Sequence, residues 1–512
     1  MLIFETILAL LLGATILSVV ARRANIPYPT LLAVGGASIA LLPGAPRLDL
    51  PPDLILALFV APVLLDAAYD TSLRDLRQNW RPVLSLVLVA VGLTTIAVAF
   101  AVRQLLADFP WPAAVALGAL LAPPDAVAAL AILRHANPPH RIRKVLEGES
   151  LLNDASALLI YKLAVGAVAA GAFSVPEALP TFAVVVLGSV AAGWLLAWPV
   201  VRLTERSPDA PTAVILQFVA TFGLWLLAER LGLSAVVTVV VFGMTAGRYA
   251  TLEMPARLRL PTFAIWDSVT FVLNVLAFTL VGLQIRPILE ALNGSERWRL
   301  LLVAMAILAV VIVVRLIWVM AYTVLRWPRR PSDSHTPSSS SFALTAKSGL
   351  VVGWSGMRGI VTLAAAMALP AGFPYRDFIQ LTAFVVVLGT LVIQGLTLRP
   401  LLVLLRLPRD TVVEAELSMA RSAALQAALA ELGAADTAAA QRLKLEFQAA
   451  LTQACQGGDP HNSADNILRR AVLPAARRAI DDLRSSGDIG DDAFRLVEAE
   501  LDRLEMSAAS PR

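Results

Sequence analysis

The stretch Gly148-Glu-Ser-Leu-Leu-Asn-Asp154 places two carboxylates, an amide and a hydroxyl inside a hydrophobic segment that continues to about Ala172. An ionisable side chain at that depth in hydrocarbon costs about 2.5–3.5 kcal/mol on membrane-insertion scales. Membrane proteins keep such groups mainly where they serve a proton or ion pathway. The segment therefore predicts a membrane helix that carries a functional site.

The composition of the whole chain agrees with a polytopic membrane protein. Of 512 residues, 58% are hydrophobic and 16% are charged, and the mean hydropathy is +0.72. Soluble domains carry about 25% charged residues. A single cysteine excludes an intramolecular disulfide, and four histidines without ligand spacing predict no bound metal or other cofactor. The net charge of +4 gives no reason to expect a nucleic-acid partner.

Apolar runs long enough to cross the lipid bilayer, about 20 residues each, predict about thirteen transmembrane helices. They lie near 2–21, 29–46, 52–70, 82–102, 111–133, 146–172, 180–202, 211–229, 233–250, 264–285, 299–325, 344–370 and 376–402. The start of the chain lacks a basic region before its apolar run and is interpreted as a first span, not a cleaved signal peptide.

Basic residues set the expected orientation of these spans. They concentrate in the loops after odd-numbered spans, for example Arg141, Arg143 and Lys144, and are sparse after even-numbered ones. The positive-inside rule then places the N-terminus outside and the C-terminus in the cytoplasm. We expect residues 1–408 to form the transmembrane domain and 409–512, which are charged and helical in spacing, to form a cytoplasmic helical tail.

The sixth predicted span presents its polar groups on one face. At about 100° per residue, Glu149 lines up with Asn153, and Ser150 lines up with Asp154 on the adjoining strip. Oxygen ligands of this kind suit hard cations. The alternative is a hydrogen-bonded contact between helices, but that contact would not need two carboxylates.

Two predicted spans carry helix breaks. Pro123 and Pro124 remove two amide donors and bar the helical conformation before them, with Asp125 at the break. In the twelfth span, Gly353 and Gly356 lie close to a buried arginine, Arg358. Broken helices at membrane depth line cavities and form ion sites, so a simple proline kink is the less economical interpretation.

The two interrupted spans run in opposite directions because their ordinal numbers differ by seven. This arrangement predicts an all-α transporter made of two inverted-topology repeats. Arg358 needs a carboxylate partner, for which we predict Glu149. Asp66 in the third span is a further candidate ligand, and Lys162 either pairs with a carboxylate or extends to the membrane surface.

Together, the motifs at 148–154, 123–125 and Gly356-Met-Arg-Gly359 resemble the monovalent cation:proton antiporter-1 family, the NhaP-type sodium/proton antiporters and their eukaryotic relatives. The resemblance covers about residues 1–405 and implies a homodimer in the bacterial cytoplasmic membrane. It also implies that an ion-binding domain moves against a fixed dimer domain.

The resemblance assigns roles residue by residue. It implies that Asp154 is the transported-ion carboxylate, that Asp125 and Ser150 are further Na⁺ ligands, and that Asn153 helps to hold the site. Glu149 and Arg358 would form a buried structural pair. Asp66 stands where relatives often have glutamate. Relatives commonly have Thr-Asp-Pro where this chain has Pro124-Asp125-Ala126, which leaves the ion selectivity open.

A mechanism follows from one carboxylate that two cations can neutralise. Na⁺ (or Li⁺) and H⁺ would compete for Asp154, and the site would cross the membrane only when neutralised. Because Asn153 beside it does not titrate, one-for-one electroneutral exchange that serves pH and sodium homeostasis is expected. A K⁺/H⁺ antiporter and a cation channel remain alternatives. An enzyme is not expected, since Ser150 has no histidine or lysine at a suitable spacing.

Overall fold

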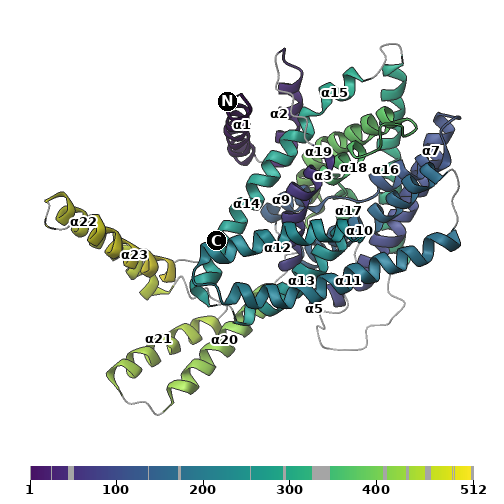
Figure 1. The fold of residues 1–512 in the computed structure, drawn as a ribbon. Coiled ribbons are helices and arrows are strands. Elements are labelled where there is room, and N and C mark those ends of the chain that lie inside the picture. Colours follow the sequence, from purple (N-terminus) through teal and green to yellow (C-terminus); the bar gives the residue numbers. More distant parts are fainter. Residues whose placement is uncertain are drawn as a thin grey trace. The chain divides into compact units, whose positions relative to one another are not determined.

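The computed structural model describes most of the chain. The described residues are 2–24, 26–43, 51–136, 138–170, 175–253, 255–291, 296–325, 346–407, 412–433, 437–455, 463–486, 488 and 491–508. Within these ranges the regular elements are all helical, which confirms the predicted all-α class (Figure 1). The chain divides into two compact units, Met1–Arg409 and Asp410–Arg512.

Eight helices of the described part are long and apolar enough to cross a membrane, and three shorter apolar helices accompany them. The chain is therefore a multi-pass membrane protein. The exact number of thirteen spans and the inverted repeats stay predictions.

Helix contacts in the first unit fall into two groups. The first bundle contains α1 (Leu2–Ala24), α2 (Tyr28–Ala40), the continuous run α3 (Pro52–Ile55), η1 (Leu56–Val60) and α4 (Ala61–Tyr69), then α11 (Val175–Glu205), α12 (Ala210–Arg230), α13 (Ala235–Glu253) and α14 (Ala256–Leu283). Helix contacts are denser within each bundle than between the two, although buried side chains of α1, α2 and α14 share a hydrophobic cluster with the second bundle.

The second bundle holds both interrupted helices. It contains α6 (Trp80–Leu84), η2 (Ser85–Ala90) and α7 (Val91–Leu105), the pair α8 (Trp111–Leu121) and α9 (Ala126–Ala136), α10 (His140–Ala170), α16 (Arg297–Leu325), the pair α17 (Ala346–Trp354) and α18 (Ile360–Met367), and α19 (Arg376–Leu405). Short helices α5 (Leu73–Gln78) and α15 (Ile285–Glu290) complete the unit. Both predicted interruptions are confirmed, at 122–125 and 355–359.

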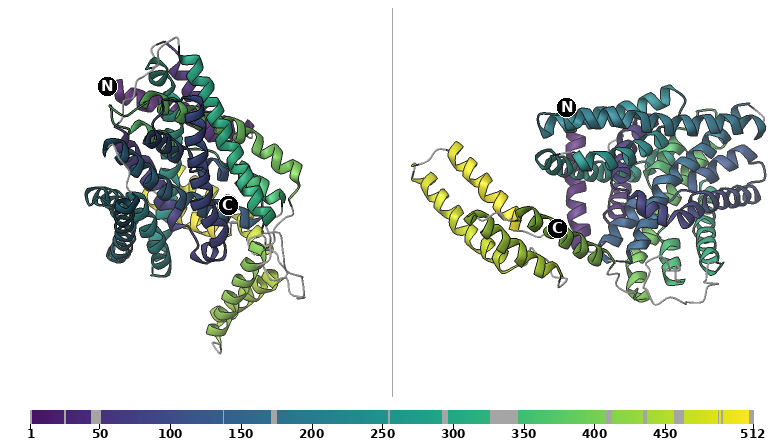
Figure 2. Two further views of the ribbon diagram at one scale, coloured as in Figure 1. Left: turned by 90° about the vertical axis from the view of Figure 1, so that its right-hand side faces the viewer. Right: turned by 90° about the horizontal axis from the view of Figure 1, so that it is seen from below.

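The second unit consists of two helix pairs. α20 (Val412–Leu432) packs on α21 (Ala438–Cys455), and α22 (Ala464–Ser485) packs on α23 (Asp491–Ala508) (Figure 2). The first pair is joined by a hydrogen bond from the Ser418 hydroxyl to the Ala454 carbonyl, at 2.7 Å. In the second pair the Arg477 guanidinium lies 2.5 Å from carboxylate oxygens of both Asp502 and Glu505.

Candidate cation site

The break between α8 and α9 is shaped by Pro123 and Pro124, which cannot donate backbone hydrogen bonds. Asp125 follows them and caps the second half-helix, because its Oδ1 accepts the Val127 amide at 2.8 Å. Its own amide donates to the Met357 carbonyl at 2.6 Å, in the other break. The two interruptions therefore touch through their backbones.

The break between α17 and α18 comes so close to Asp125 that it requires glycine at 359. A Cβ atom built on Gly359 would lie 1.8 Å from the Asp125 Oδ2 and 2.5 Å from its Cγ. Real Cβ contacts essentially never fall below 3.0 Å. The glycine thus lets the start of α18 approach the carboxylate that begins α9.

Arg358 is fully buried where the two broken helices cross, and its side chain donates hydrogen bonds to backbone carbonyls at the end of α8. Its Nε donates to the Leu121 carbonyl at 2.9 Å and its Nη2 donates to the Ala122 carbonyl at 3.3 Å, while Nη1 bonds the Gly356 carbonyl. The last carbonyls of a helix lack intrahelical partners and carry partial negative charge. Arg358 is therefore a cationic cap on the C-terminal end of α8.

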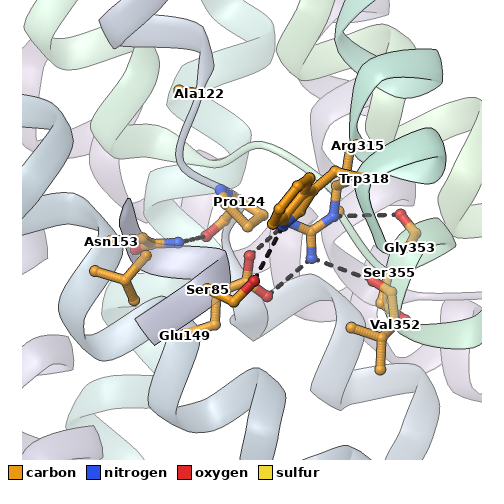
Figure 3. Close-up of polar contacts among 12 residues, drawn as sticks. Ser85, Ala122, Pro124, Glu149, Asn153, Arg315, Trp318, Val352, Gly353 and Ser355 are labelled. Atoms are coloured by element: carbon orange, nitrogen blue, oxygen red, sulfur yellow. Dashed lines mark hydrogen bonds and ion pairs between the residues drawn. The ribbon is translucent and has the colours of Figure 1, made fainter. Parts of the chain in front are cut away.

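The predicted pairing of Glu149 with Arg358 is wrong, because Glu149 pairs with Arg315 of α16. The Arg315 Nη1 and Nη2 lie 2.5 and 2.8 Å from the two carboxylate oxygens, with both side chains at most 2% exposed. Figure 3 shows this two-pronged contact beside Trp318, whose indole donates to the Ser85 hydroxyl at 3.2 Å.

Arg315 also caps the first half of the other broken helix. Its Nε donates to the Gly353 carbonyl at 3.2 Å and its Nη2 donates to the Val352 carbonyl at 3.1 Å, near the end of α17. Arg315 is not among the residues predicted from the sequence. The available signal was a lone arginine in the middle of the apolar run of α16, which alone would have suggested a buried carboxylate partner.

Asn153 braces the break beside the cation site. Its Nδ2 donates to the Pro124 carbonyl at 2.9 Å, while its Oδ1 is buried and has no hydrogen-bond partner in the part of the chain that the structure describes. In Figure 3 the amide points at Pro124 from α10. The geometry gives Asn153 a role in positioning the broken helix.

A cavity of about 1160 Å³ brings the predicted ligands together. Asp125, Ser150 and Asp154 line it from the second bundle, and Asp66 lines it from the first. Asp154 is only 9% exposed. Among the described residues no group of three or more acidic, histidine or cysteine side chains is close enough to hold a metal ion by itself. A cation here would therefore need hydroxyl, backbone or water oxygens as well.

Two further polar residues of the predicted spans, Lys162 and Gln217, lie outside the cavity lining. Lys162 is exposed and forms no ion pair within the described residues, which favours extension toward the membrane surface over pairing. Gln217 of α12 accepts a hydrogen bond from the Trp266 indole of α14 at 2.5 Å, which joins these two helices.

Two broken helices that cross beside a carboxylate-lined cavity are typical of membrane transporters. A family model described as sodium/hydrogen exchanger, transmembrane, matches residues 7–404. The chain belongs to this family of transporters.

Relatives and solved structures agree with this assignment. An uncharacterized Na⁺/H⁺ exchanger of Mycobacterium bovis is 33% identical over 99% of this chain and 96% of its own length. The low-affinity Na⁺/H⁺ antiporter NhaS1 of Synechocystis is 31% identical over 82% of this chain and 77% of its own length. The structure of the sodium proton antiporter MjNhaP1 from Methanocaldococcus jannaschii matches with a TM-score of 0.60 and 19% identity, covering 79% of this chain and 99% of that one, and supports the fold.

Proposed function

We propose that this chain exchanges Na⁺ or Li⁺ for H⁺ one for one, with Asp154 binding either cation in turn. The observation that carries the proposal is the position of Asp154 and Asp125, on different helices, in one cavity next to the crossing of the broken helices. Ser150 on the same face of α10 adds a neutral oxygen, and the remaining coordination comes from backbone or water oxygens.

Exchange results from competition for a buried carboxylate. A bare Asp154 resists crossing the membrane because burial of an unpaired charge is unfavourable, and either Na⁺ or H⁺ removes that charge. The pair Glu149–Arg315 stays neutral as a unit and takes no part in the cycle. Asn153 holds the Pro124 carbonyl and adds no titrating group.

The two bundles give the cycle its moving parts. Since helix contacts are denser within each bundle than between them, the second bundle can carry the site past the first as one body. The first bundle would form the contact with a second copy of the chain in a homodimer. Residues 1–408 supply the transport domain and 409–512 supply a cytoplasmic tail.

The basic residues indicate how the protein and its cavity are oriented in the membrane. Arg22, Arg143 and Lys144 line the cavity together with the carboxylates. Under the positive-inside rule they lie in the cytoplasm, so the cavity opens inward and the N-terminus lies outside. We place the protein in the bacterial cytoplasmic membrane.

A second candidate is K⁺/H⁺ exchange. A relative from Bacillus pumilus, named a sodium, potassium, lithium and rubidium/H⁺ antiporter, is 32% identical over 74% of this chain and 58% of its own length. Position 124 is proline, where the resemblance to the antiporter family leads us to expect a threonine with a side-chain hydroxyl. Fewer oxygen donors around the site would favour a larger, more weakly hydrated cation.

The test is dissipation of a pH gradient in proteoliposomes, with Na⁺, Li⁺, K⁺ and Ca²⁺ added in turn. Wild-type protein should respond to Na⁺ and Li⁺, and Asp154→Asn should not respond at all. Asp209→Asn is the matched control, because this exposed carboxylate only caps α12 through the Thr212 amide. Cation-dependent proton flux in Asp154→Asn would refute the assignment, and a rate that changes under an imposed membrane potential would refute electroneutrality.

A further inference from the structure

One face of α14, in the first bundle, lines the cation cavity opposite the broken helices. Asp267, Thr270, Phe271, Asn274 and Phe278 all contribute to the cavity wall. Their spacing of three and four residues is that of a single helix face. Asp267 and Asn274 are seven residues apart, so their side chains point the same way about 10 Å apart along the helix axis.

The polar side chain of Asn274 does not hold the fold together through hydrogen bonds in the part of the chain that the structure describes. Its amide makes no hydrogen bond within the described residues, whereas the neighbouring Thr270 hydroxyl bonds its own helix at the Trp266 carbonyl, at 2.9 Å. An amide without a partner costs about 1–3 kcal/mol when it is removed from water. A transmembrane helix keeps such a group at low cost only where it faces a wet cavity or a ligand.

The rest of α14 is fixed to the first bundle. The Trp266 indole bonds Gln217 of α12 and its ring stacks on Phe218, with centroids 4.6 Å apart. Toward the other end, a Cβ on Gly282 would lie 2.2 Å from the Ala33 carbonyl oxygen, so α14 touches the backbone of α2. The helix that carries Asn274 is therefore packed as part of the first bundle.

We propose that Asn274 is a cation ligand contributed by the first bundle, which takes up the partly dehydrated cation as it leaves or approaches Asp154. Amide oxygens bind hard cations and carry no charge, so they hold the ion weakly enough to release it. Asp267 lies nearer the helix start and is exposed, and its carboxylate concentrates cations toward the cavity mouth. This inference rests on the proposed cation/proton exchange and adds a cation ligand from the first bundle to it.

Because Asn274 stays with the first bundle, it meets the ion only when the site opens toward this cavity. Its removal should therefore affect cation binding from one side of the membrane. Everted vesicles expose the side that the basic residues mark as cytoplasmic, and right-side-out vesicles expose the other. A group that merely supports the fold would affect both sides alike.

The test compares Asn274→Leu and Asn274→Gln with wild-type protein in both kinds of vesicle. Loss of one oxygen ligand should raise the KM for Na⁺ about 5- to 10-fold in everted vesicles, with kcat within about twofold and the KM in right-side-out vesicles unchanged. Glutamine, which keeps the amide, should restore most of the affinity. Ser268→Ala is the control, since this hydroxyl also lies on the cavity wall but bonds the Ala264 carbonyl.

The outcomes separate this proposal from the exchange function itself. A wild-type chain without cation/proton exchange would overturn the proposed function. Wild-type exchange with an unchanged KM in Asn274→Leu, or an equal KM change on both sides, would overturn only the role of Asn274. If Asn274→Leu does not accumulate, Asn274→Ala removes the same oxygen with a smaller side chain and is judged by the same two readouts.

Discussion

Replacing Arg315 with glutamine should strongly destabilise the membrane unit. The change removes the partner of Glu149 and leaves a buried carboxylate that is 1% exposed. It also withdraws two donors from the carbonyls of Val352 and Gly353 at the end of α17. Breaking a buried ion pair by removing one partner costs about 3–5 kcal/mol.

The expected shift in melting temperature follows from the size of the unit. With an unfolding entropy of about 2.1 cal/mol/K per residue over roughly 400 residues, 3–5 kcal/mol corresponds to a loss of about 4–6 °C. The measurement is thermal unfolding of the detergent-solubilised protein. The control is Arg286→Gln, which breaks a much more exposed pair, Arg286–Glu290 at 2.8 Å, and should cost at most about 1 kcal/mol.

The partner of Glu149 can be settled by double variants. Combining Glu149→Gln with Arg315→Gln removes both charges. The double variant should regain at least half of the melting temperature that Arg315→Gln alone loses. Combining Glu149→Gln with Arg358→Gln should regain less of the melting temperature that Arg358→Gln alone loses, because the carbonyls at the end of α8 would still lack the Arg358 donors. Greater recovery with Arg358 than with Arg315 would refute the pairing.

Three further predictions follow from contacts of the second bundle and from the division of the chain. Gly359→Ala should reduce exchange at least tenfold, since its Cβ would collide with Asp125, whereas Gly372→Ala has open space and should leave the rate unchanged; an active Gly359→Ala would contradict the close crossing. Tyr161→Phe removes a 2.9 Å hydrogen bond to α18 and should cost about 1 kcal/mol in thermal unfolding, so an unchanged or raised melting temperature would contradict it. Deleting 409–512 should leave exchange in proteoliposomes, and loss of activity in folded protein would show that the tail belongs to the transport domain.

The helix breaks could be predicted from sequence because their causes are local. Pro123 and Pro124 forbid helical hydrogen bonds whatever surrounds them, and the glycines before Arg358 relax the backbone in the same short segment. The shared face of Ser150 and Asp154 likewise follows from helix geometry alone. Those predictions needed no knowledge of which helices are neighbours.

The partner of Glu149 could not be predicted in the same way. Helix geometry gives the direction in which a side chain points, but not which of two buried arginines it meets. Arg358 lies in a recognisable motif beside a helix break, whereas Arg315 lies in an otherwise apolar run with no motif around it. Only tertiary packing determines which arginine meets Glu149. Tertiary packing likewise brings Asp267 and Asn274 of α14 to the cavity wall, which the sequence could not show.

The charges that the second bundle brings to the crossing of the broken helices give the proposed one-for-one exchange a physical reason. Within the second bundle, Glu149, Asp125 and Asp154 supply three formal negative charges and Arg315 and Arg358 supply two positive ones, so this set, which leaves out Asp66 of the first bundle, carries −1. The arginines are committed to helix ends and to Glu149, and cannot leave without exposing buried carbonyls. One monovalent cation or one proton brings the total to zero, whereas two would leave +1 in a low-dielectric region. The same argument explains why each arginine caps a helix end near the site: both balance the carboxylates without blocking the cavity.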